Sequence, residues 1–210
     1  MTATTRPGEL PVRLTTGDTR KPADMERQWF GWSARNPVAA LLIVGVIATQ
    51  IATTIGYFLP AAGLPSLPWP LFNGVLSATA SKYGTAGSFF VGEFVHFLNG
   101  VVFVFLFAIL MYNRLPFGRR RSAALWKAMT FAVILTLISA GILVPLVYEP
   151  HQGYGFLSFF GPLGWKLPLA ILVWHLVYGV HIAALHDPAK AARFAAPAGP
   201  EDARAAASAS

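Results

Sequence analysis

The sequence contains no cysteine, and this absence excludes disulfide bonds and thiolate metal sites. Charged residues are also scarce, at 12% of the chain, against about 25% in soluble domains. Hydrophobic residues make up 55%. This balance excludes an ordinary soluble globular domain and favours a protein that lies in a lipid bilayer.

Sequence motifs of soluble enzymes are missing as well. The polar segments at the two ends of the chain contain no nucleophile elbow, no phosphate-binding glycine loop and no pair of catalytic carboxylates. We therefore expect no hydrolase or kinase activity. A redox membrane subunit is the one enzymatic alternative that the sequence leaves open.

Four long apolar runs dominate the chain, at residues 37–58, 88–112, 126–147 and 163–185. Each is close to the roughly 20 residues of helix that cross a bilayer. Glu93 is the only charged residue inside the second run, and Lys127 and Lys166 lie at the rims of the third and fourth. The runs predict an all-α fold, a four-helix transmembrane bundle that runs up-down-up-down.

The polar ends of the chain differ in composition from the four runs. Residues 1–35 are polar and charged, and residues 188–210 are Ala-rich and of low complexity. Such compositions bury too little apolar surface to fold alone. We expect both segments to be disordered and the transmembrane domain to occupy residues 36–187.

Basic residues are concentrated before the first apolar run, between the second and third runs, and after the fourth. Positively charged segments stay on the cytoplasmic side of a membrane. We therefore expect both termini and the middle loop to be cytoplasmic, in the inner membrane of a bacterium, as the Ala- and Arg-rich composition suggests. The net charge of +7 then serves topology and contact with anionic lipid, and we expect no nucleic-acid partner.

Two loops on the opposite side of the membrane, residues 59–87 and 148–163, are rich in aromatic residues and glycine or proline but poor in charge. Unstructured loops as long as the first are uncommon. Three arrangements are open for both loops. They lie on the bilayer surface, fold over the outer end of the bundle, or contact another membrane protein.

Polar side chains recur inside the runs at helical spacing. On a helical wheel those of each run gather on one face, and we expect the four faces to turn inward as a polar seam in the outer half of the bundle. The seam residues are Gln50, Thr53, Glu93, Asn99, Thr136, Ser139 and Tyr178. One interpretation is structural, because small and polar residues are what hold membrane helices together.

A pair of histidines suggests a second interpretation. His96 and His175 lie in the second and fourth runs, and a glycine follows each by four residues, at Gly100 and Gly179. In an up-down-up-down bundle these two helices are diagonal, so the imidazoles would ligate one b-type haem from opposite sides, with the glycines making room for the macrocycle.

Glu93 supports two further alternatives. With His96 it forms the Glu-x-x-His pair of di-iron bundles, but position 172 is Leu and the runs hold no second acid. The metal alternative that remains is a single ion held by Glu93, His96 and His175. The main prediction is that no metal is bound. A buried acid also suits a proton-coupled or small-solute carrier.

The segments around the histidines also repeat. HFLNGV at residues 96–101 and HLVYGV at 175–180 share a pattern that would make the chain two copies of one helical hairpin. With these motifs, residues 37–186 resemble a group of bacterial four-helix membrane proteins that carry His-Phe-x-x-Gly in one helix and His-Leu-x-Tyr-Gly in the last. The resemblance implies a multi-pass membrane fold and no established activity.

The sequence as a whole predicts a multi-pass inner-membrane protein that serves as a non-enzymatic small subunit or scaffold. Its expected partners are the lipid bilayer and another membrane protein, which it would contact through the two outer loops. The first alternative is a haem-binding anchor that exchanges electrons with quinone through His96 and His175. The second is the carrier that uses Glu93.

Overall fold

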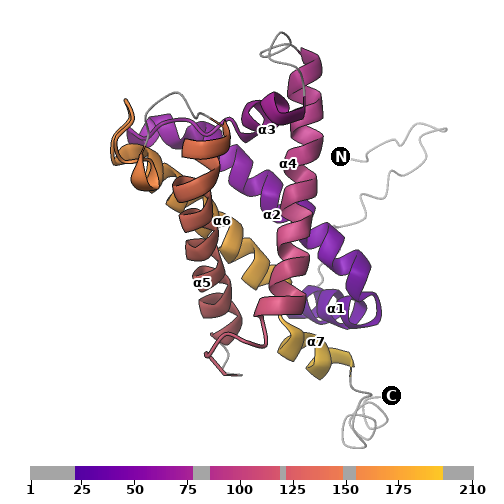
Figure 1. Ribbon diagram of the computed structural model, residues 1–210. Helices are drawn as coiled ribbons and strands as arrows, with labels where there is room; N and C mark the ends of the chain where they lie inside the picture. Colours follow the sequence, from indigo (N-terminus) through magenta and orange to yellow (C-terminus); the bar gives the residue numbers. More distant parts are fainter. Residues whose placement is uncertain (1–21, 78–85, 119–121, 149–154, 196–210) are drawn as a thin grey trace, which may run out of the picture.

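The computed structural model describes residues 22–77, 86–118, 122–148 and 155–195. Within these residues every regular element is helical, which confirms the all-α prediction (Figure 1). The α-helices are α1 (Pro22–Arg35), α2 (Pro37–Phe58), α3 (Trp69–Ser77), α4 (Ala86–Leu106), α5 (Ala123–Ile138), α6 (Lys166–Leu185) and α7 (Pro188–Ala195). Short 3₁₀ segments are η1 (Leu59–Ala62) and η5 (Phe156–Ser158), and π-helical segments are η3 (Phe107–Met111) and η4 (Ser139–Tyr148).

Four continuous helical segments are long and apolar enough to cross a membrane, Pro37–Ala62, Ala86–Met111, Ala123–Tyr148 and Lys166–Ala195. They alternate in direction (Figure 1). The short helix α3 lies at one end of the bundle, the α3 end, while α1 and α7 lie together at the other, the α1–α7 end. The four apolar runs of the sequence correspond to these segments.

The four spanning helices form an open row. Helix α2 packs against both α4 and α6, and α5 packs against α6. Among the described residues α4 and α5 have almost no direct contact, and only η3 at the end of α4 reaches α5. Each hairpin packs on itself, but the proposal that the two are copies of one unit stays a prediction.

Small residues decide which face of α2 is buried. A methyl group at Gly45 would overlap the backbone of Val101 on α4, and one at Gly56 would overlap Trp174 on α6. Helices in lipid associate through close packing rather than a hydrophobic driving force. The prediction that Gln50 points into the bundle is therefore wrong. Gln50 is exposed, because the glycine face takes the position between the neighbouring helices.

The described part of the first long loop folds over the bundle. Helix α3 packs along α4 at close range, since a methyl group at Gly92 would overlap the Pro70 carbonyl and the backbone of Gly74. Trp69 and Asn73 of α3 are buried. Of the three arrangements that the sequence left open for this loop, residues 59–77 therefore adopt the bundle contact, and residues 78–85 lie outside the described residues.

A proline in the third spanning segment explains how the second loop is fastened. In a π-helix each carbonyl accepts from the N–H five residues ahead, and the residue five after Ala140 is Pro145, which has no N–H. The Ser158 hydroxyl supplies the missing donor and bonds the Ala140 carbonyl over 2.6 Å. Leu157 and Ser158 adopt positive φ angles of 50° and 61°, a costly conformation for residues other than glycine.

The described parts of the two segments that were expected to be disordered form helices instead, α1 in the first and α7 in the second. The Glu26 carboxylate of α1 pairs with Lys190 of α7 over 2.7 Å. The indole of Trp29 donates to the Leu185 carbonyl at the end of α6 over 2.8 Å. Apolar and charged side chains of these two ends thus find partners in each other, which composition alone did not indicate. Residues 1–21 and 196–210 lie outside the described residues.

The junction between α6 and α7 is held by polar contacts at the α1–α7 end. One carboxylate oxygen of Asp187 accepts hydrogen bonds from the first backbone N–H groups of α7, as a helix cap does.

A second polar contact at this end joins α5 to the residue after η3. The Lys127 ammonium lies 4.3 Å from the centre of the Tyr112 ring. Burial, and secondarily the Asp187 carboxylate, raise the pKa of Tyr112 above its usual value.

The contact between α2 and α4 gives a direct test of this packing. A methyl group at Gly100 would overlap the Thr49 hydroxyl of α2, so Gly100→Ala is expected to lower the free energy of unfolding by about 1–3 kcal/mol. Thermal unfolding in detergent measures the change. The matched control is Val102→Leu, which adds bulk on the exposed side of the same helix and is expected to unfold like the parent. Equal stability of Gly100→Ala and the parent would contradict the close contact.

Candidate functional site

A small polar cavity, the histidine cavity, lies in the half of the bundle nearer α3. It has a volume of about 60 Å³ and is enclosed by α3, α4, η4 and α6. Its lining consists of Trp69, Asn73, His96, Asn99, Gly100, Phe103, Ser139, Leu143, Tyr148, Trp174, His175 and Tyr178. The row of helices is open between α4 and η4, and the half-buried Phe103 and Leu143 line the cavity on that side.

Both histidines of the sequence motifs reach this cavity and find hydroxyl partners. The Nε2 of His96 lies 2.7 Å from the Thr53 hydroxyl of α2. In His175, Nδ1 lies 2.8 Å from the Ile171 carbonyl of its own helix. A carbonyl only accepts, so Nδ1 carries the proton, and Nε2 is the acceptor for the Ser139 hydroxyl at a long 3.5 Å.

Two asparagines connect three helical elements across the cavity. Asn99 of α4 donates its amide to the Asn73 side-chain oxygen of α3 over 3.0 Å, and the Tyr148 hydroxyl of η4 donates to the same oxygen over 3.3 Å. The amide nitrogen of Asn73 in turn donates to the Trp69 carbonyl. Asn73 therefore links α4 to η4, two elements that scarcely touch directly.

Tyr178 ties α6 to α4. Its hydroxyl donates to the Gly100 carbonyl over 2.5 Å, so the glycine that lets α4 approach α2 also supplies a backbone acceptor to α6. The Trp174 ring lies between the histidines, 5.6 Å from the His96 ring and 5.0 Å from the His175 ring. An indole ring thus lies directly beside both imidazoles.

The predicted seam separates into three groups. The structure brings His96, Asn99, Ser139, His175 and Tyr178 together around the cavity, with Thr53 behind His96. Thr136 instead donates to the Ala132 carbonyl of its own helix. Gln50 and Glu93 lie outside the cavity.

The side chains that lie outside form a second candidate site, the α2–α4 polar strip, defined as Gln50, Thr54, Tyr57 and Glu93. Gln50 and Thr54 are exposed and bond only each other and the Gln50 carbonyl. Tyr57 is 42% exposed and lies within electrostatic reach of Glu93. Oε2 of Glu93 is buried without a hydrogen-bond partner. The strip therefore has unused hydrogen-bonding capacity within an apolar surface.

Six cavity residues were not identified from the sequence: Trp69, Asn73, Phe103, Leu143, Tyr148 and Trp174. Trp69 and Asn73 are one helical turn apart in a segment that the sequence analysis treated as loop, and this i, i+4 spacing of an aromatic and an amide was the available signal. Tyr148 and Trp174 carry no pattern that separates them from ordinary interfacial aromatics.

The residues of the cavity do not fit a haem. Sites for cofactor-sized ligands enclose roughly 300–1,000 Å³, whereas the histidine cavity encloses about 60 Å³. The space beside Gly100 is occupied by Thr49, and that beside Gly179 by Ala128, Met129 and Ala132. The two glycines therefore make room for neighbouring helices rather than for a macrocycle.

A metal ion lacks a ligand set in the described part of the chain. No group of three or more His, Asp or Glu side chains gathers there at metal-binding range. Glu93 is absent from the cavity lining, so it does not complete a site with His96 and His175.

The fold and these sites define a class, a helical protein with four apolar helices of membrane-spanning length and a polar interior near one end. No protein-family model, curated protein or solved structure matches the chain. The resemblance to bacterial four-helix membrane proteins stays a prediction.

An absorption spectrum tests the fit of haem. Protein purified in detergent from haem-supplied cells is expected to show no Soret band, as isolated or after dithionite, because the cavity is too small for a macrocycle. The matched pair of variants is His96→Ala in the cavity and His181→Ala, whose ring bonds its own helix at the Val177 carbonyl. A Soret band that is lost in the first variant and kept in the second would contradict the expectation.

Proposed function

We propose that this protein is a non-enzymatic, multi-pass membrane subunit that associates with another membrane-spanning chain through the α2–α4 polar strip. The observation that carries the proposal is the exposure of Gln50 and Thr54 beside Tyr57 and Glu93, on helices of membrane-spanning length. Lipid tails offer these groups no hydrogen-bond partner, and a neighbouring helix does.

The depth of the strip strengthens this argument. Gln50 is thirteen residues from Pro37 at the start of α2, which at 1.5 Å per residue is about 20 Å along the helix. Glu93 is seven residues from the start of α4, or about 10 Å. Both side chains thus lie well inside the apolar segments. Polar side chains at such depth connect helices, each hydrogen bond contributing about 0.6–2 kcal/mol.

The histidine cavity supports the same role from inside the chain. Five of its lining side chains, Asn73, His96, Asn99, Tyr148 and Tyr178, take part in hydrogen bonds between helical elements. Such a network rigidifies a bundle, as a subunit that presents a fixed surface requires. The two alternative functions gain less support. The cavity is too small for the haem of an electron-transfer anchor, and Glu93, on which a carrier would depend, does not line it.

Removing the polar strip is expected to weaken the association. In the double variant Gln50→Leu, Glu93→Leu we expect about tenfold less partner chain at equal protein, since two interhelical hydrogen bonds amount to about 1–3 kcal/mol. The measurement is the stoichiometry of chains in nanodiscs excised directly from the native membrane, by mass spectrometry and photobleaching.

Thr130→Val on α5 is the control for loss of a polar group, because its hydroxyl bonds the Trp126 carbonyl of its own helix and serves no neighbour. It is expected to keep the partner. A second copy of this chain or a different membrane protein would both satisfy the proposal. A wild-type chain that is single and unpartnered in nanodiscs would refute it.

For the topology we propose that the α1–α7 end faces the cytoplasm of a bacterial inner membrane. The support is the charge distribution along the described segments. Arg27, Arg35, Arg114, Lys190 and Arg193 belong to segments at or next to this end. At the α3 end Lys166 is the one basic residue among the described residues. Cytoplasmic segments carry such an excess of Lys and Arg.

The cysteine-free sequence allows a clean test of this orientation. Ser66→Cys at the α3 end and Ser122→Cys at the α1–α7 end both replace exposed serines. A membrane-impermeant maleimide is expected to label the first in intact cells and the second only after lysis, while the cysteine-free parent controls for background. The reverse pattern would overturn the orientation.

A further inference from the structure

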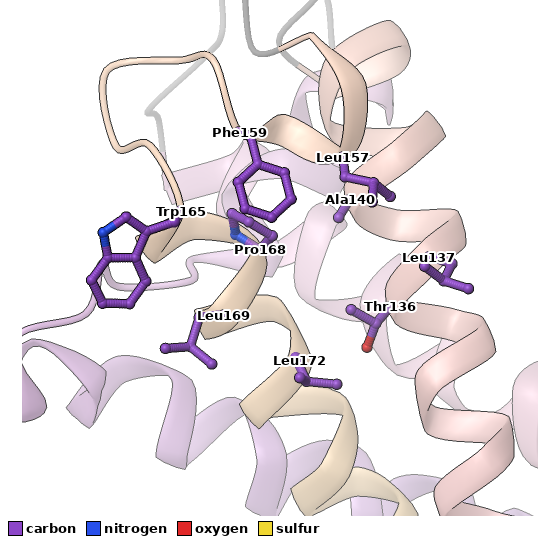
Figure 2. Close-up of a pocket in the computed structure, with 9 residues that line it drawn as sticks. All are labelled: Thr136, Leu137, Ala140, Leu157, Phe159, Trp165, Pro168, Leu169 and Leu172. Carbon is purple, nitrogen blue, oxygen red and sulfur yellow. The ribbon is translucent and has the colours of Figure 1, made fainter.

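A separate, apolar pocket lies between α6 and the segment α5–η4 at the α3 end. It has a volume of about 330 Å³. Figure 2 shows Leu172 of α6 pointing toward Thr136 and Leu137 of α5, with Leu157 and Phe159 at the upper end. Thr136 is the only lining residue with a polar side chain besides Trp165, and its hydroxyl already bonds its own helix.

Specific contacts hold the upper wall of this pocket in place. The hydrogen bond from Ser158 to the Ala140 carbonyl holds the segment against η4, and Ala140 itself lines the pocket. The adjoining Leu157 keeps an unfavourable positive φ. Strained backbone of this kind gathers where a chain clamps a ligand.

The surroundings of the pocket select the chemistry of an occupant. Both walls belong to helices long and apolar enough to span a bilayer, so the pocket opens toward hydrocarbon. Water gains nothing there, because an apolar cavity offers it no hydrogen-bond partners. The occupant must therefore be apolar and must come from the membrane.

The residues at the mouth of the pocket favour an occupant that also carries a charged headgroup. Trp165 lines the pocket at the very start of α6, is 59% exposed, and is followed directly by the exposed Lys166. Tryptophan favours the level of the lipid headgroups, and a lysine there attracts a phosphate. Lys166 forms no ion pair within the described residues. From Trp165 to Leu172 the pocket extends about 10 Å along the helix, away from this level and into the apolar layer.

We propose that this pocket binds one acyl chain of a phospholipid, whose phosphate lies at Lys166. The site is distinct from the polar strip on α2 and α4, and it does not depend on the association proposed there. It makes a lipid molecule a bound component of the α5–α6 hairpin, clamped beneath Leu157 and Phe159.

Native mass spectrometry of the full-length protein tests the site with dioleoyl phosphatidylglycerol as the probe. After delipidation and titration, the parent is expected to retain one probe molecule more tightly than any further ones. Leu172→Trp fills the pocket and is expected to weaken this retention at least tenfold. Leu98→Trp, the same change at an exposed site on α4, is expected to leave it unchanged, and Lys166→Gln is expected to weaken it several-fold.

A probe with a diazirine on its acyl chain locates the site in the unaltered protein, and this keeps the proposal testable if Leu172→Trp folds poorly. Adducts on Leu137, Leu169 or Leu172 support it, whereas adducts spread over all the spanning helices refute it. Equal retention by Leu172→Trp and Leu98→Trp also refutes it. An isoprenoid quinone that is recovered from the purified protein and displaces the probe would replace phospholipid as the occupant and overturn the assignment.

Discussion

The close approach of helices at glycine is the interaction on which the rest of this structure depends. Gly100 lets α4 lie against Thr49 of α2. This proximity brings His96 within 2.7 Å of the Thr53 hydroxyl. The carbonyl of the same glycine accepts the hydroxyl of Tyr178 from α6. A single residue without a side chain thus fixes the positions of three helices, and the polar network follows from their spacing rather than causing it.

The polar residues divide between two environments according to this packing. Most of those around the histidine cavity are enclosed and hydrogen-bonded within the chain, although the Thr49 hydroxyl beside Gly100 is buried without a partner. On the far side, Gln50 and Thr54 of α2 are exposed in an apolar surface, and Oε2 of Glu93 on α4 has no hydrogen-bond partner. In water both groups of side chains could bond solvent, and the difference between them would matter little. In a bilayer an enclosed pair stabilises the chain itself and an exposed group needs a partner from outside. This contrast is why we assign association, rather than chemistry, to the protein.

The number, type and order of the spanning helices could be predicted from the sequence, because long apolar runs have few other stable solutions in a membrane. His96, Asn99, His175 and Tyr178 were likewise placed in a polar interior. The predicted orientation of α2 was wrong. A helical wheel considers only the polarity of the side chains, and it gives no weight to how closely Gly45 and Gly56 allow neighbouring helices to approach. Asn73 was missed because its short helix packs against α4 and η4, a tertiary effect that local patterns do not contain.

Pro145 has a consequence for the order in which the chain assembles. A helix that enters a bilayer alone must satisfy its own carbonyl groups, and in the third spanning segment Pro145 offers no N–H to the Ala140 carbonyl. The donor is the hydroxyl of Ser158, eighteen residues later and beyond the end of that segment. The hydrogen bond at Ala140 therefore forms only when Ser158 has come to lie against the third segment. During biosynthesis α5 and α6 would enter the membrane as a hairpin, not as independent helices.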